Sequence, residues 1–111
     1  MKENLKVYDA INDARESGKR AAVATVVKVM GSSYRREGAK MFIDENENNI
    51  GLISGGCLES DVAEEAKKVI ESGKPRMKFY DLDEDFMWGL GLGCPGKVKI
   101  YIEPISQEVK I

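Results

Sequence analysis

The stretch Ile50-Gly51-Leu52-Ile53-Ser54-Gly55-Gly56-Cys57-Leu58-Glu59 combines a short apolar run, a pair of glycines and a cysteine. Apolar residues then recur at helical spacing from Val62 to Ile70, which predicts a helix that begins just after the cysteine. This order of strand, tight glycine turn and helix start is an arrangement that directs free backbone N–H groups toward one spot. The positive end of the helix dipole points to the same spot. The anion of a thiol at that spot would be stabilised. We therefore expect an anion-binding turn at Ser54, Gly55 and Gly56 that carries the Cys57 thiol.

A second glycine-rich stretch, from Met87 to Gly96, also carries a cysteine, Cys94. Glycine at this density costs chain entropy, and it indicates positive-φ positions or a close approach of the backbone to a ligand. The stretch is not a dinucleotide-binding fingerprint, because no helical pattern follows it. Two glycine loops with one cysteine each favour a shared site. The alternative is that each cysteine is an inert, buried side chain.

The loop from Gly31 to Ala39 places adjacent arginines beside hydroxyl groups. Guanidinium groups and serine hydroxyls match the oxygens of a phosphate, so this loop is a candidate phosphate clamp. A solvated connection is the alternative. The candidate residues are Ser32, Ser33, Arg35 and Arg36.

The remaining pattern predicts an amphipathic helix near the N-terminus, ended by Gly18, and a second helix from Leu58 to Ser72, ended by Gly73. It also predicts five strands, of which the second and third form an internal hairpin across the turn Glu45–Asn48. This order indicates an α+β or α/β fold with a mixed β-sheet packed by two helices. The expected strands are Ala21–Val29, Lys40–Asp44, Asn49–Ile53, Arg76–Asp81 and Lys97–Glu103.

Length and composition limit the classes of protein to which the chain can belong. The 111 residues, with a net charge of −2, predict one domain, residues 1–111, and argue against nucleic acid as the main partner. No apolar run approaches the ~20 residues of a membrane span, so we expect a cytoplasmic protein. With two cysteines and no histidine, the chain has too few ligands for a structural zinc site.

Several of these motifs together resemble the N-terminal domain of the XdhC/CoxI family, accessory proteins of molybdenum hydroxylases such as xanthine dehydrogenase and carbon monoxide dehydrogenase. The resemblance extends from about Val23 to Glu103. The motifs that carry it are Ala24-Thr25-Val26-Val27, Gly31-Ser32-Ser33, Gly38-Ala39-Lys40-Met41, Gly51 through Asp61, and Trp88 through Gly96.

The resemblance implies a chaperone that binds the molybdenum cofactor (molybdopterin) as cargo and assists its sulfuration or its insertion into an apo-hydroxylase. By position, Cys57 and Cys94 would handle the cofactor with Ser54, Gly55, Gly56, Gly91 and Gly93, and the loop with Ser32, Ser33, Arg35 and Arg36 would contact its phosphate. The sequence departs from the family at Tyr34, Glu37 and Pro95, and we expect the domain to act without a C-terminal Rossmann-like domain of its own.

A cofactor chaperone, rather than an enzyme, is the leading hypothesis. Its expected partners are the apo-hydroxylase, a cysteine desulfurase, a second copy of the chain and a separate Rossmann-like subunit, with no nucleic acid and no membrane. One alternative is a small sulfur-relay or redox enzyme that uses Cys57 as its nucleophile. Another is an interaction module that dimerises through a sheet edge, with both thiols unreactive.

Overall fold

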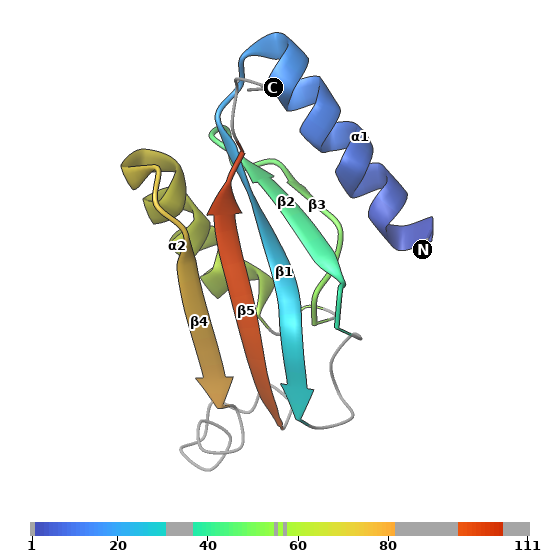
Figure 1. Cartoon of the computed structure of the whole chain (residues 1–111), viewed down its shortest axis with the longest axis vertical. Coiled ribbons are helices and arrows are strands. Elements are labelled where there is room, and N and C mark those ends of the chain that lie inside the picture. Colours follow the sequence, from blue (N-terminus) through green and yellow to red (C-terminus); the bar gives the residue numbers. More distant parts are fainter. Residues whose placement is uncertain (1, 31–36, 55, 57, 82–95, 106–111) are drawn as a thin grey trace, which may run out of the picture.

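A computed structural model describes residues 2–30, 37–54, 56, 58–81 and 96–105 of the chain. In these residues five strands form one sheet in the order β3-β2-β1-β5-β4, and two helices pack against it (Figure 1). The elements are α1 (Lys2–Ser17), β1 (Ala21–Met30), β2 (Lys40–Asp44), β3 (Asn49–Ile50), α2 (Glu59–Ser72), β4 (Arg76–Asp81) and β5 (Lys97–Pro104).

The predicted α+β class is confirmed, and the α/β alternative is not realised. The sequence pattern favours a mixed sheet, whereas every described pair of neighbouring strands is antiparallel. A parallel pair needs a crossover connection between neighbours in the sheet. Helix α2 is a crossover of that kind, but it joins β3 to β4, which lie at opposite edges of the sheet.

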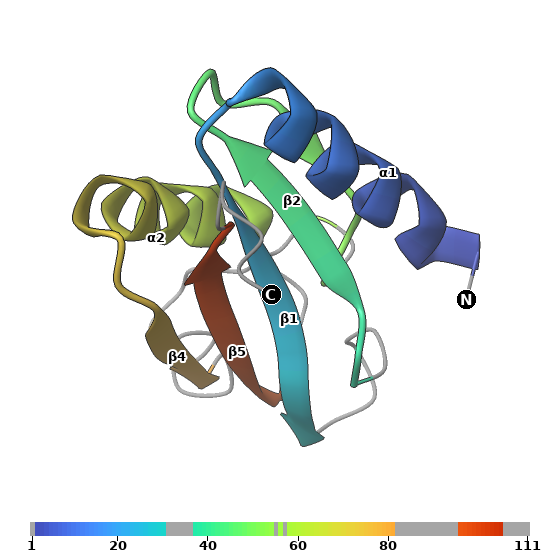
Figure 2. The ribbon, with the colours of Figure 1, turned by 45° about the horizontal axis from the view of Figure 1, so that its top comes forward.

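The sheet has an apolar core on each face. On one face α2 packs over β1 and β5, where Val62 and Val69 meet Ile100 in a cluster of fully buried side chains. On the other face α1 packs over β2 and β3, with Val7 and Phe42 in a smaller cluster (Figures 1 and 2). Burial of each such side chain contributes about 1.5–3 kcal/mol. The larger cluster therefore holds α2 firmly against the centre of the sheet.

The buried face of α1 agrees only in part with the apolar spacing of Leu5, Tyr8, Ile11 and Ala14 that predicts this helix. The apolar spacing that begins at Leu5 and Tyr8 predicts that both pack inward, but their exposed fractions are 57% and 46%. The buried residues of α1 are Asn4, Val7, Ala10 and Ala14, and Ile11 packs partly buried against the same cluster. The amide of Asn4 donates a hydrogen bond of 3.0 Å to the carbonyl oxygen of Gly38, so a polar residue occupies part of the helix interface.

The third strand is shorter than predicted and ends at Ile50, because the backbone turns at Gly51. The φ angle of Gly51 is +97°, and a Cβ atom there would collide with the backbone oxygen of Lys40 and lie 2.8 Å from the side chain of Val7. Glycine is thus required both for the turn and for the close approach to β2 and α1. The residues after Gly51 leave the sheet and lead to α2.

Helix α2 ends at Gly73, as predicted. Gly73 has a φ of 72°, and its N–H group donates to the carbonyl oxygen of Val69 at 2.8 Å. The guanidinium of Arg20 donates to the carbonyl oxygen of Ile70 in the same last turn. Neither helix of the described chain is long and apolar enough to cross a membrane.

Candidate functional site

Two of the connections that carry predicted site residues leave the sheet at the same end. Strand β1 ends at Met30, just before the loop of residues 31–36, and β4 ends at Asp81, just before residues 82–95. Met30 and Asp81 both lie opposite Lys97, the first residue of β5. Three strand ends therefore lie side by side at one end of the sheet (Figure 1). The topology brings together the starts of two loops that are far apart in the sequence.

The first turn of α2 reaches the same end of the sheet. The hydroxyl of Tyr80, the residue before the end of β4, donates a hydrogen bond of 2.5 Å to the Asp61 carboxylate. Burial, followed by the hydrogen bond to Asp61, raises the pKa of Tyr80 far above its usual value of 10.0. Tyr80 therefore stays protonated and keeps donating to Asp61 at neutral pH. The contact places the first turn of α2 beside the end of β4.

The turn before α2 is closed by the carboxylate of Glu59. Glu59 Oε2 accepts hydrogen bonds of 2.9 Å from the N–H groups of Ile53 and Ser54. Glu59 Oε1 accepts a bond of 2.6 Å from the Ser54 hydroxyl and a bond of 2.9 Å from the Gly56 N–H group. A single side chain thus binds both the start and the middle of the turn.

Ser54 links this carboxylate to the start of the helix. Its hydroxyl donates to Glu59 and also accepts a hydrogen bond of 2.9 Å from the N–H group of Leu58. Leu58 is the N-cap residue of α2, and its own side chain makes no capping bond. Ser54, which is buried, thus binds the backbone N–H group of the N-cap residue itself and ties the turn to the start of the helix.

The hydrogen bonds to Glu59 determine its charge state. Burial alone raises the pKa of this carboxyl, but the bonds from the Ser54 hydroxyl and from the backbone of Ile53 and Ser54 outweigh it. The net effect is a pKa below the usual value of 4.5. Glu59 is therefore ionised at neutral pH, and its bonds to the turn are charge-assisted.

These contacts change what the predicted anion-binding turn offers to a ligand. The N–H groups of Ile53, Ser54 and Gly56 already have a carboxylate acceptor. A phosphate could bind to these groups only by displacing Glu59. In the sequence, the helix dipole is a sufficient explanation for Glu59, so sequence reasoning misses this residue. The N–H groups of Ile53, Ser54 and Gly56 that Glu59 binds all precede the helix, so the helix pattern gives no signal for this contact.

Of the predicted site residues, the structure describes Ser54 and Gly56. Ser54 is buried and hydrogen-bonded as above, and Gly56 is exposed with a φ of +115°. The other predicted site residues lie outside the described residues. They are Ser32, Ser33, Arg35, Arg36, Gly55, Cys57, Gly91, Gly93 and Cys94.

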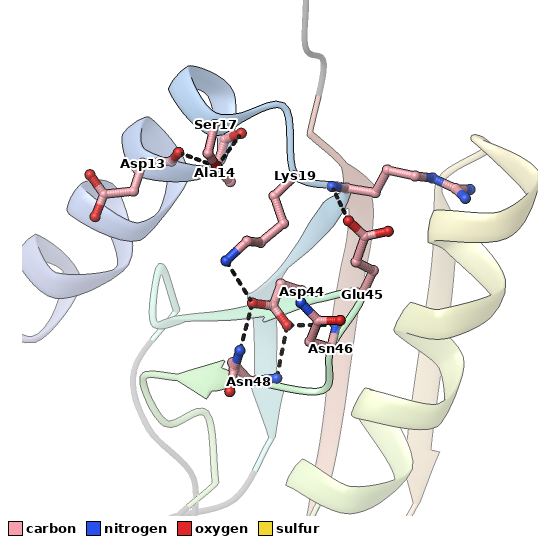
Figure 3. Close-up of polar contacts among 9 residues, drawn as sticks. Asp13, Ala14, Ser17, Lys19, Asp44, Glu45, Asn46 and Asn48 are labelled. Carbon is pink, nitrogen blue, oxygen red and sulfur yellow. Dashed lines mark hydrogen bonds and ion pairs between the residues drawn. The ribbon is translucent and has the colours of Figure 1, made fainter.

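A pocket of about 410 Å³ lies at the other end of β1, between α1 and the β2–β3 turn, with Phe42 and Ile50 among its apolar lining residues. Its most buried polar group, the Asp44 carboxylate, accepts bonds of 2.9 Å from the Asn46 and Asn48 N–H groups and from the Asn48 side chain (Figure 3). Lys19 Nζ lies 3.9 Å from the same carboxylate. These contacts stabilise the hairpin turn, and we assign the pocket no ligand.

Comparison with known proteins adds independent information. The XdhC and CoxI family matches residues 14–81. The chain is 38% identical over 104 residues to a probable xanthine dehydrogenase subunit of Bacillus subtilis, and the match covers 92% of this chain and 31% of that protein. It is 39% identical over 94 residues to the molybdenum cofactor insertion chaperone PaoD of Escherichia coli, and this match covers 84% of this chain and 29% of that protein.

A solved structure supports the fold. A xanthine dehydrogenase from Bacillus halodurans matches with a TM-score of 0.74 and 39% sequence identity, over 88% of this chain and 30% of that chain. The chain thus spans about 30% of the length of each of these three relatives. The match to residues 14–81, together with these identities, shows that the chain belongs to the XdhC and CoxI family.

Proposed function

We propose that this domain binds the molybdenum cofactor as cargo and assists the maturation of a molybdenum hydroxylase. The observation that carries the proposal is the meeting of Met30, Asp81 and Lys97 at one end of the sheet, beside the first turn of α2. The loops that hold the candidate phosphate contacts and both cysteines start or end there. The names of two relatives, a cofactor insertion chaperone and a probable xanthine dehydrogenase subunit, support the same role.

In this proposal the two cysteines provide soft sulfur ligands for the molybdenum dithiolene end of the cargo. The backbone on both sides of Cys57 is held in place, because the Gly56 N–H group is bound by Glu59 and the Leu58 N–H group by Ser54. In this proposal the turn serves to position the Cys57 thiol. Phosphate binding falls to the arginines and serines of residues 32–36, since Glu59 occupies three N–H groups of the turn.

The test is retention of the molybdenum cofactor by purified protein. Cys57→Ser and Cys94→Ser should each reduce the amount of bound cofactor, and the double variant should reduce it further. Arg35→Ala together with Arg36→Ala should weaken retention through loss of phosphate contacts. Asn12→Ala, at an exposed position of α1, is the matched control and should retain cofactor as the wild type does.

Two results would count against the proposal. Unchanged cofactor retention in the double cysteine variant would remove the thiols from the site. Turnover of a persulfide or disulfide substrate that requires Cys57, without any cofactor retention by the wild type, would instead support the small thiol enzyme.

A further inference from the structure

One half of a sheet face is left open by the helices in the described part of the chain. Helix α1 packs over β2, β3 and the start of β1 at Ala21, and α2 packs on the opposite face, so the α1 side of β5, β4 and the second half of β1 carries no described helix (Figure 2). We call this surface the open face. Its principal residues are Lys28, Met30, Met77, Phe79, Lys97 and Lys99.

The strand register determines which residues share the open face. Val98, Ile100 and Ile102 are fully buried on the α2 side, so Lys97 and Lys99, which alternate with them, point to the other side. A bulge between Val26 and Lys28 shifts the register, which places Lys28 directly opposite Lys99. Phe79 lies opposite Lys99 on the other flank. One row across the sheet is therefore Lys28, Lys99 and Phe79.

The next row toward the loop end of the sheet is Met30, Lys97 and Asp81. Lys97 lies 4.0 Å from the Asp81 carboxylate. This row contains the same strand ends that define the candidate functional site. The open face is thus continuous with the end of the sheet where the predicted cofactor loops begin.

The open face exposes apolar side chains beside unneutralised positive charge. The exposed fractions of Met30, Met77 and Phe79 are 42%, 53% and 52%. Lys28 and Lys99 face each other across neighbouring strands, and neither has an acidic partner among the described residues. Like charges directly opposite each other destabilise a sheet. An acidic partner would relieve this cost on binding.

We infer that the open face is a docking surface for a protein partner whose contact patch combines acidic side chains with an apolar centre. Resting on the proposed function, the inference identifies that partner as the apo-hydroxylase. The partner's carboxylates would pair with Lys28 and Lys99, and its apolar residues would cover Met77 and Phe79. Docking here would hold the receiving protein next to the strand ends Met30 and Asp81, beside the cofactor site.

The test measures binding of the full chain to the purified molybdenum-binding subunit of the host's xanthine dehydrogenase, produced without cofactor. The wild type should bind with an affinity that falls as NaCl is raised. Lys99→Glu should weaken binding at least tenfold, and Phe79→Thr should weaken it with little change in the salt dependence. Lys6→Glu makes the same change of charge at an exposed position of α1 and should bind like the wild type.

A second readout separates docking from folding. Lys99→Glu replaces a repulsive cross-strand pair by an attractive one, so its unfolding midpoint should match or exceed that of the wild type while its binding falls. Cofactor retention should be unchanged in Lys99→Glu and Phe79→Thr. If the partner binds through this face and the cofactor is not retained, the proposed function fails and the docking surface stands.

Three results would overturn the inference. One is that the wild type does not bind the apo-hydroxylase, or that Lys99→Glu and Phe79→Thr bind it as tightly as the wild type does. Another is protection of Lys28 and Lys99 from amine labelling in the protein alone, which would mean that a second copy or other chain already covers the face. The third is that the wild type binds a single-stranded RNA oligonucleotide more tightly than it binds the apo-hydroxylase, and that Lys99→Glu abolishes this RNA binding.

Discussion

The hydroxyl of Ser54 donates a 2.6 Å hydrogen bond to the carboxylate of Glu59, five positions later in the chain. This contact joins the end of an irregular segment to the first residue of α2. Because Glu59 also binds three backbone N–H groups, it stabilises the turn and the helix start together. The conformation on both sides of Cys57 depends on this one side chain.

Glu59→Gln should therefore lower the free energy of unfolding by about 1–3 kcal/mol, the typical cost of removing a charged partner from hydrogen-bonded groups. The measurement is urea denaturation at neutral pH. Glu64→Gln, on an exposed part of the same helix, is the matched control and should change stability by less than about 0.5 kcal/mol. Equal losses in the two variants would show that Glu59 does not hold the turn.

The stability of the protein should decrease as the pH falls below the usual pKa of a carboxyl group. Hydrogen bonds lower the pKa of Glu59 below 4.5 and that of Asp44 below 3.8, although burial of each group opposes the shift. A carboxyl with a lowered folded-state pKa contributes stability above its unfolded-state pKa and loses it as the pH falls through the folded value. The midpoint of unfolding, measured at several pH values between 7 and 3, should therefore decrease as the pH falls.

The Glu59→Gln variant is the control for the acid response. Its stability should depend less steeply on pH than that of the wild type, because one of the two shifted carboxyls is gone. Parallel pH profiles for the two proteins would mean that other groups determine the acid sensitivity.

Gly51→Ala should destabilise the fold more than Gly56→Ala. Both glycines have positive φ angles, which costs about 1–3 kcal/mol for a residue with a side chain. At Gly51 the new Cβ would also collide with the Lys40 backbone, whereas no atom lies within 4 Å of the corresponding position at Gly56. We expect a loss of about 2–5 kcal/mol at Gly51 by chemical denaturation. A smaller loss there than at Gly56 would contradict the close approach of β2.

Tyr80 should ionise only at strongly alkaline pH. Its burial and its bond to Asp61 raise its pKa above the usual 10.0. Subtracting the absorbance titration of Tyr80→Phe from that of the wild type isolates this residue. The difference should show a midpoint well above pH 10, and Asp61→Asn should lower that midpoint. A difference curve centred at or below pH 10 would show that the α2–β4 contact is absent in solution.

Much of the fold follows from local patterns in the chain. Apolar and β-branched runs predict all five strands, and Gly73 predicts the end of α2. The polar residues Glu45–Asn48 predict the hairpin turn, which the structure closes with bonds to Asp44. Each of these signals depends on residues a few positions apart, so the physical cause is contained in the sequence.

The sequence by itself determined which segments become helices and strands, and it singled out two glycine loops with one cysteine each. Tertiary structure alone decided that Met30, Asp81 and Lys97 meet at one end of the sheet, because strand order depends on contacts between distant segments. It also decided that the Glu59 carboxylate, rather than a ligand, occupies three N–H groups of the turn. The register shift that sets Lys28 against Lys99 is likewise a property of paired strands, since neither strand specifies it alone.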